Sequence, residues 1–64
     1  MKALTPLELR IAKLVAWGMN TREIAREIKR PWHSVRNSTE IILEKTGARR
    51  LAQAVYILTK GGMI

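Results

Sequence analysis

The sequence predicts an all-α fold, with four helices packed into a single domain that spans residues 1–64. Three observations favour this fold. Apolar residues recur at steps of three and four along four segments, which is the spacing of one helix face. Residues typical of helix starts precede these segments, and glycine or proline follows them. The length of 64 residues leaves room for one small core.

The first helix is expected over residues 6–17. Thr5 is a suitable N-cap, and Pro6 can occupy the first helical position, where its missing N–H is not needed. Glu8 can complete a capping box with Thr5. Gly18 can adopt the left-handed conformation that ends helices. The apolar stripe of this helix consists of Leu7, Ile11, Leu14 and Val15.

The second helix is expected over residues 21–29. Asn20 is its predicted N-cap, and Glu23 completes a second capping box. Pro31 disfavours α geometry in Arg30, so the helix should end before them and the chain should turn a corner. A short helix, a tight corner and a longer helix describe a helix-turn-helix.

The third helix is expected over residues 32–46. It can begin at Pro31 or Trp32, and Gly47 can end it. One side carries Val35, Ile42 and Leu43, and the faces free to meet a partner carry Trp32, His33, Arg36, Asn37 and Glu40.

The fourth helix is expected over residues 51–60, ended by Gly61 and Gly62. Its apolar residues extend beyond a single stripe, because Tyr56 and Ile57 widen the apolar surface around its side. In so short a chain, this pattern predicts that part of the helix packs on another protein.

The formal net charge is +7, from 12 basic and 5 acidic residues. Such an excess attracts polyanions, chiefly nucleic acid or an anionic membrane surface. A plain solvated basic surface is the alternative. Basic residues in or beside the predicted corner are Arg22, Arg26, Lys29, Arg30, Arg36, Arg49 and Arg50.

The composition argues against an enzyme and against a bound cofactor. The chain has no cysteine, and its five glutamates offer no convincing catalytic pair, since two are expected caps and the others fit helix charge pairs. His33 has no second metal ligand at helical spacing. No apolar run approaches a membrane span and no signal peptide is recognisable, so we expect a cytoplasmic protein with no membrane partner. Helix caps and glycine terminators disfavour a membrane-surface peptide.

Ordered sequence fragments match one known family over nearly the whole chain. The fragments are LTPLELRIAKLVAWGMNTREIA from Leu4 onward, then Val35-Arg36-Asn37, Lys45 with Gly47, and Gln53-Ala54-Val55. Each fragment alone is weak, but their order along the chain is a stronger signal. From Leu4 to its C-terminus, the sequence resembles the LuxR/GerE-type helix-turn-helix domain of bacterial transcription regulators.

This resemblance implies a four-helix domain that inserts its third helix into the major groove of double-stranded DNA and often forms dimers through its fourth helix. The expected function is therefore transcription regulation by a sequence-specific DNA-binding homodimer. The chain departs from the family pattern at Arg30 and Pro31, where an apolar residue and serine are usual. It also has Ser38 where histidine is usual, polar Thr39 and Thr46 where apolar residues are usual, and acidic Glu40.

Four residues of the third helix are expected to contact bases. Arg36 matches the basic contact position of the family, and a guanidinium can pair with both acceptors of guanine. A phosphate contact or free solvation is the alternative for Arg36. Asn37 can pair with adenine, and Glu40 can accept from the amino group of cytosine, although it would repel phosphate. The four predicted base contacts are His33, Arg36, Asn37 and Glu40.

A second set of residues is expected to contact phosphates, because free N–H groups and the positive end of a helix favour an anion. Ser34 can equally bond its own backbone. Trp32 can pack at the corner or lie against the DNA backbone. The predicted phosphate contacts are Asn20, Thr21, Arg22, Ser34, Arg49 and Arg50.

The dimer or partner interface is expected on the fourth helix or on the surface of Leu9 and Trp17. An alternative function is a small interaction module that pairs with a larger LuxR-type regulator and modulates it. The predicted interface residues of the fourth helix are Leu51, Val55, Tyr56 and Leu58.

Overall fold

A computed structural model describes residues 2–64, and this part of the chain is all-helical, with four helices and no strand. The first two helices each end one residue earlier than expected, because Trp17 and Lys29 are their C-caps. The other bounds match the predicted ones. The helices are α1 (Pro6–Ala16), α2 (Thr21–Ile28), α3 (Trp32–Thr46) and α4 (Leu51–Lys60).

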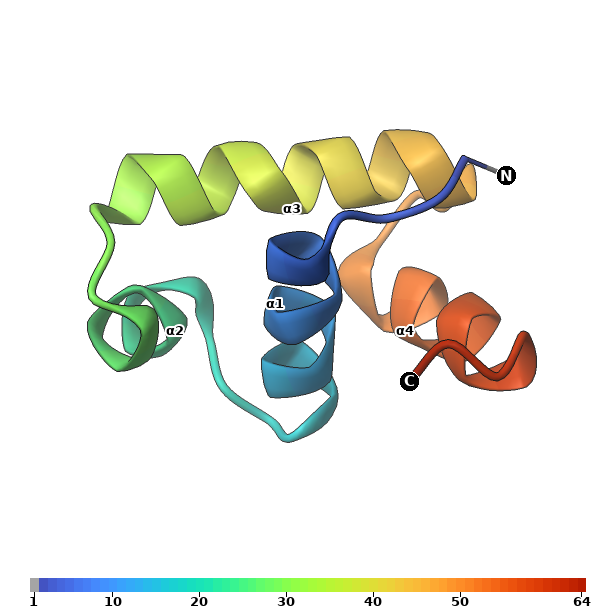
Figure 1. Ribbon diagram of the computed structural model, residues 1–64, viewed down its shortest axis with the longest axis horizontal. Helices are drawn as coiled ribbons and strands as arrows, with labels where there is room; N and C mark the ends of the chain where they lie inside the picture. The colour runs from blue at the N-terminus through green and yellow to red at the C-terminus, as the bar shows by residue number, and fades with distance from the viewer. Residues whose placement is uncertain (1) are drawn as a thin grey trace.

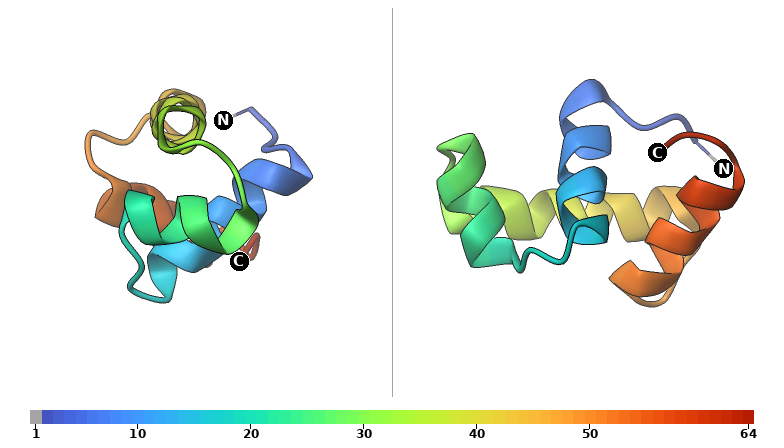
Figure 2. Two further views of the ribbon diagram at one scale, coloured as in Figure 1. Left: turned by 90° about the vertical axis from the view of Figure 1, so that its left-hand side faces the viewer. Right: turned by 90° about the horizontal axis from the view of Figure 1, so that it is seen from below.

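The longest helix, α3, lies along one side of the molecule, and α1 packs beneath it between α2 and α4 (Figure 1). α1 contacts all three other helices, whereas α2 and α4 contact α1 and α3 but not each other. Viewed along its axis, α3 stands apart at the top with its outer side uncovered (Figure 2). The arrangement therefore leaves one long helix face free.

The core draws on all four helices. Side chains with no solvent exposure include Ile11, Ile24, Val35 and Leu58. Leu58 was expected at a partner interface, and this prediction is wrong, because its side chain is fully buried in the chain's own core. Burying such side chains stabilises the fold by roughly 1.5–3 kcal/mol each. The complete buried core is Ile11, Ala12, Ile24, Ala25, Val35, Ile42, Ala54 and Leu58.

Both predicted capping boxes are present. The Thr5 hydroxyl accepts from the Glu8 N–H at 3.2 Å, and the Glu8 carboxylate accepts from the Thr5 N–H at 2.9 Å. Asn20 and Glu23 make the same reciprocal pair at the start of α2, with both distances 2.9 Å. α3 begins at Trp32 with Pro31 as its N-cap residue and without a side-chain cap.

The corner between α2 and α3 is made by a left-handed residue. Lys29 has φ 56° and ψ 48°, and the N–H of Arg30 donates back to the carbonyl of Ala25 at 3.0 Å. A bond from an N–H to the carbonyl five residues before it is typical of helix ends that close through a left-handed residue. Pro31 then adopts extended backbone geometry, and α3 begins at the next residue.

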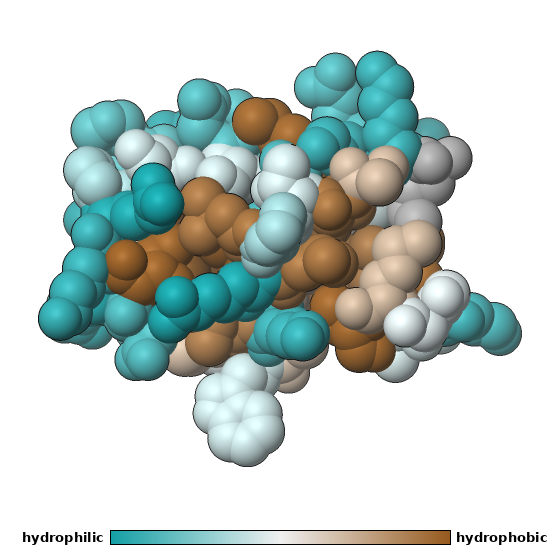
Figure 3. Space-filling model, viewed as in Figure 1, coloured by the Kyte–Doolittle hydropathy of each residue, from teal (hydrophilic) through white to brown (hydrophobic). Residues whose placement is uncertain are grey.

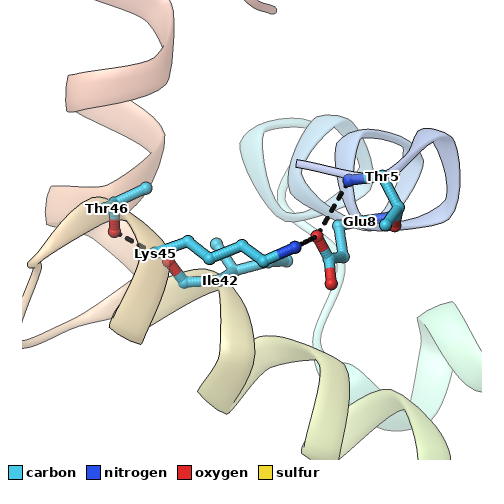
Figure 4. A network of polar contacts seen from close by, with 5 residues as sticks. All are labelled: Thr5, Glu8, Ile42, Lys45 and Thr46. Atoms are coloured by element: carbon cyan, nitrogen blue, oxygen red, sulfur yellow. Dashed lines mark hydrogen bonds and ion pairs between the residues drawn. The ribbon is translucent and has the colours of Figure 1, made fainter. Parts of the chain in front are cut away.

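An ion pair joins the start of α1 to the end of α3 (Figure 4). The Lys45 ammonium lies 2.7 Å from the same Glu8 oxygen that accepts from the Thr5 N–H. Burial alone raises the pKa of the Glu8 carboxyl, but the bonds from Lys45 and Thr5 outweigh it, so the pKa lies below its ordinary value. The Lys2 N–H also donates to the Lys45 carbonyl at 3.3 Å, which ties the N-terminal segment to the same end of α3.

Two threonine hydroxyls of α3 are paired within the helix. The buried Thr39 hydroxyl donates to the Arg36 carbonyl at 2.6 Å, and the Thr46 hydroxyl donates to the Ile42 carbonyl at 2.8 Å. Because each hydroxyl bonds to its own helix, neither leaves an unpaired polar group in the interior.

Candidate nucleic-acid interface

The four predicted base-contact residues lie together on the outer face of α3. His33, Arg36, Asn37 and Glu40 are all exposed, and their spacing of three, one and three residues keeps them on one side of a helix. Val35, which is fully buried, marks the opposite side. The structure therefore brings this predicted set into one accessible surface, available to a partner along the uncovered side of α3.

The predicted phosphate contacts at the start of α2 are partly engaged within the protein. The Asn20 side-chain oxygen accepts from the Glu23 N–H as a helix cap, which leaves only its NH₂ group for a ligand. The Thr21 hydroxyl accepts from the indole N–H of Trp32 at 3.0 Å, and its own hydrogen remains available to a phosphate. Arg22 is exposed.

Trp32 lies where the two helices of the corner meet. It is half-buried and packs against the core, as the packing alternative expected. Two arginines also make cation–π contacts with its ring. The guanidinium carbon of Arg22 lies 4.5 Å from the ring centroid, and that of Arg36 lies 5.5 Å from it. This stacking between residues of α2 and α3 was not predicted, because nothing in the local sequence pattern shows it.

An open basic groove runs along α2 beside Trp32. Its basic residues are Arg22, Arg26, Lys29 and Arg30, and Glu23 is its one acidic residue. Arg26, Lys29 and Arg30 were part of the basic cluster in the sequence, but no contact was assigned to them. The groove is lined by Asn20, Arg22, Glu23, Ala25, Arg26, Lys29, Arg30 and Trp32.

The remaining predicted phosphate contacts lie in the first turn of α3 and in the link that follows α3. Ser34 is half-buried in the first turn of α3, and its backbone N–H donates to the Pro31 carbonyl at 3.1 Å. Arg49 and Arg50 are exposed in the link that follows α3. Since α3 has 15 residues, these arginines lie on the order of 20 Å from the groove of α2, at the other end of the helix.

Charge changes sign along the exposed side of α3. Arg36 lies in its first half, whereas Glu40 and Glu44 are exposed in its second half. Lys45, which could have offset these carboxylates, is held by Glu8. The basic groove of α2 and Arg36 therefore lie apart from the acidic second half of α3.

Comparisons of the chain with models of protein families, with curated proteins and with solved structures each found no match.

Between residues 2 and 64, no three potential metal-ligating side chains of histidine, cysteine or acidic type come together. None of the four helices has the length and apolar character needed to cross a bilayer.

The candidate partner surfaces lie away from the basic groove. Tyr56 on α4 is 61% exposed, and Leu51 and Val55 beside it are half-buried. Trp17, at the end of α1, is 84% exposed, while Leu9 is half-buried. Apolar side chains also reach the surface on the face shown in Figure 3, between hydrophilic regions. Because α4 lies on the far side of α1 from α2, a partner there would leave the groove accessible (Figure 1).

Proposed function

We propose that this protein is a sequence-specific DNA-binding regulator of transcription whose α2 and α3 form a LuxR/GerE-type helix-turn-helix. The observation that carries the proposal is the placement of His33, Arg36 and Asn37 on the exposed side of α3, directly beside the basic groove of α2. A major groove about 12 Å wide admits one α-helix, and phosphates border it on both sides.

In this mechanism, the basic side chains of α2 and the corner bind phosphates and fix the orientation of α3. These contacts supply affinity that falls with salt but little sequence preference. Arg36 and Asn37 then read base edges, since guanidinium and amide groups match the paired acceptors and donors of guanine and adenine. Glu40 would accept from the amino group of cytosine. Its negative charge disfavours positions next to a phosphate.

A single domain of this size offers few base contacts, so we propose that it acts as a homodimer on a two-fold-symmetric site. Tyr56, Leu51 and Val55 of α4 are the proposed interface residues. The setting is the bacterial cytoplasm, and the role is binding rather than catalysis.

The decisive experiment is selection of sequences from a random duplex pool at two salt concentrations, with the oligomeric state measured by analytical ultracentrifugation. An enriched palindromic motif bound by two copies would support the proposal. Retention that is equal for all sequences, or no retention at low salt, would contradict sequence-specific binding.

The exposure of Trp17 favours a second candidate function. A tryptophan that is 84% exposed at the end of α1 is typical of a protein contact. In this second proposal, the chain pairs with a larger LuxR-type regulator and modulates it. A stable mixed dimer with such a regulator, together with no retention on duplex DNA, would favour this function over direct DNA binding.

A further inference from the structure

Arg22 and Arg36 approach the same aromatic ring from two different helices. Arg22 is the second residue of α2, and Arg36 lies in the second turn of α3. Their guanidinium carbons lie 4.5 Å and 5.5 Å from the Trp32 ring centroid. The two charges therefore lie no more than about 10 Å apart, although 14 positions separate them in the chain.

The Trp32 ring is itself held in a fixed orientation. Its N–H donates to the Thr21 hydroxyl at 3.0 Å, and its apolar body packs against the buried core. A side chain fixed by both a hydrogen bond and core packing has few alternative rotamers. The ring is therefore a rigid support on which flexible arginines can rest.

The stacked arginines keep their charge available. The one ion pair within residues 2–64 is between Glu8 and Lys45, so neither Arg22 nor Arg36 is neutralised by a carboxylate. The face of an indole ring offers no strong hydrogen-bond acceptor, so a guanidinium beside it keeps N–H groups free to bind the oxygens of a phosphate. Both side chains are exposed to solvent.

We propose that Trp32 is a positioning residue that holds Arg22 and Arg36 together so that they bind neighbouring phosphates of one polyphosphate strand. This inference rests on the proposed function for its natural ligand, the DNA backbone. It adds a phosphate contact to the base contact proposed for Arg36, since a guanidinium has five N–H donors. Phosphates follow one another about every 3.4 Å along the axis of a duplex strand, so two groups this close can reach neighbours.

The stacking lowers the entropic cost of binding, because each arginine is already restricted before the ligand arrives. Ordering a free, long side chain at an interface weakens association, and a preformed arrangement avoids that loss. Trp32→Leu should therefore reduce affinity for a phosphate strand about tenfold. It leaves the net charge unchanged, so the salt dependence of binding should stay close to that of the parent protein.

The test compares Trp32→Leu, Trp32→Phe, Arg22→Ala and Arg36→Ala for binding to inorganic polyphosphate and to a random 16-base-pair duplex. Trp17→Leu is the matched control, since Trp17 is exposed and both cation–π contacts of Arg22 and Arg36 are with Trp32. Far-ultraviolet circular dichroism confirms that each variant is helical. The expected result is a roughly tenfold loss for Trp32→Leu, recovery to within about threefold for Trp32→Phe, which retains a ring face, and no change for Trp17→Leu.

A structural role for Trp32 alone would not produce recovery by phenylalanine together with an unchanged salt slope. The arginine variants should each lower the salt slope by about 0.9. A variant that carries both Arg22→Ala and Arg36→Ala should lose less affinity than the two single losses combined. Parent-like affinity of Trp32→Leu, or independent losses from the two arginines, would overturn the proposal.

The two ligands separate this proposal from the proposed function. Polyphosphate has neither bases nor a groove, so Trp32-dependent binding to it supports the arginine pair even when the duplex selection fails. Trp32-independent binding to both ligands overturns the pair and leaves DNA binding intact. For the free protein, upfield ring-current shifts of the Arg22 and Arg36 side-chain protons should be present and should disappear in Trp32→Leu; their absence from the parent protein also overturns the proposal.

Discussion

At the scale of single residues, Lys29 shows how the corner of this molecule is formed. Its φ is positive, at 56°, and in this conformation the Cβ atom of any residue other than glycine crowds the following carbonyl. The sequence indicated that α2 ends here because of Pro31, but it did not show that Lys29 itself would adopt the left-handed conformation. Lys29 adopts this conformation at a cost in stability. Its side chain adds a positive charge to the groove.

Lys29→Gly should therefore stabilise the fold by up to about 1 kcal/mol, because glycine adopts positive φ without steric conflict. Urea unfolding followed by circular dichroism measures this change. Binding of polyphosphate should weaken slightly at the same time, since the groove loses one charge. A stability loss would show that the Lys29 side chain contributes more than its backbone conformation costs.

Arg36 is the residue with the most specific proposed role. If it contacts a base as well as phosphate, Arg36→Ala should reduce affinity for a selected site by about 1–3 kcal/mol and affinity for random duplex by less. Fluorescence anisotropy at fixed salt measures both affinities. Arg10→Ala, which removes an exposed arginine of α1, is the control. Equal losses on the two duplexes would restrict Arg36 to phosphate contact.

At the scale of helices, features set by neighbouring residues were predicted from the sequence, whereas contacts between residues far apart in the chain were not. Thr5 with Glu8 and Asn20 with Glu23 form capping boxes within three residues, so the sequence alone was sufficient to predict them. The bond between Glu8 and Lys45 joins residues 37 positions apart, and no local pattern reveals such a contact. Glu8 was therefore correctly predicted as a cap but not as a link between α1 and α3.

Glu8→Gln should destabilise the protein at neutral pH by roughly 1–3 kcal/mol, because it removes a charge-assisted hydrogen bond to Lys45. The pKa of Glu8 is lowered on folding, so its contribution is fully present above the unfolded value near 4.5 and is lost as pH falls through the lower folded value. The stability difference between parent and variant should therefore shrink below about pH 4.5.

Thermal unfolding between pH 7 and pH 2.5 measures this difference. Glu27→Gln is the control, because Glu27 is exposed and makes no ion pair within residues 2–64. A difference between Glu8→Gln and the parent that stays constant across this range would show that the carboxylate charge does not stabilise the fold.

At the scale of the whole molecule, helical spacing predicted which residues could be buried but not what would cover each one. Val35 and Ile42 were expected to face the core and do so. Leu58 shares the spacing of Leu51 and Val55, yet only Leu58 is fully buried. How far α1 covers α4 depends on the packing of the whole fold, so it could not be predicted from the spacing of residues within α4. The exposed side of α3 was easier to predict, because it is the face that the core does not use.

The small size of the core makes single substitutions severe. A domain of this length is stabilised by roughly 3–10 kcal/mol in total. Ile11→Ala should cost about 2–5 kcal/mol, because Ile11 is fully buried on α1, which contacts the other three helices. The variant should be largely unfolded near physiological temperature by differential scanning calorimetry. Ile41→Ala, at a residue that is 38% exposed, should change stability by less than about 0.5 kcal/mol.

The N-terminal segment is anchored at Lys2 to the carbonyl of Lys45, at the end of α3 farthest from α2. The chain also finishes on the α4 side of the molecule, so both ends lie away from the α2 corner (Figures 1 and 2). A fluorophore, an affinity tag or a peptide that tethers two copies can therefore be attached at either end without obstructing Arg22, Trp32 and Arg36.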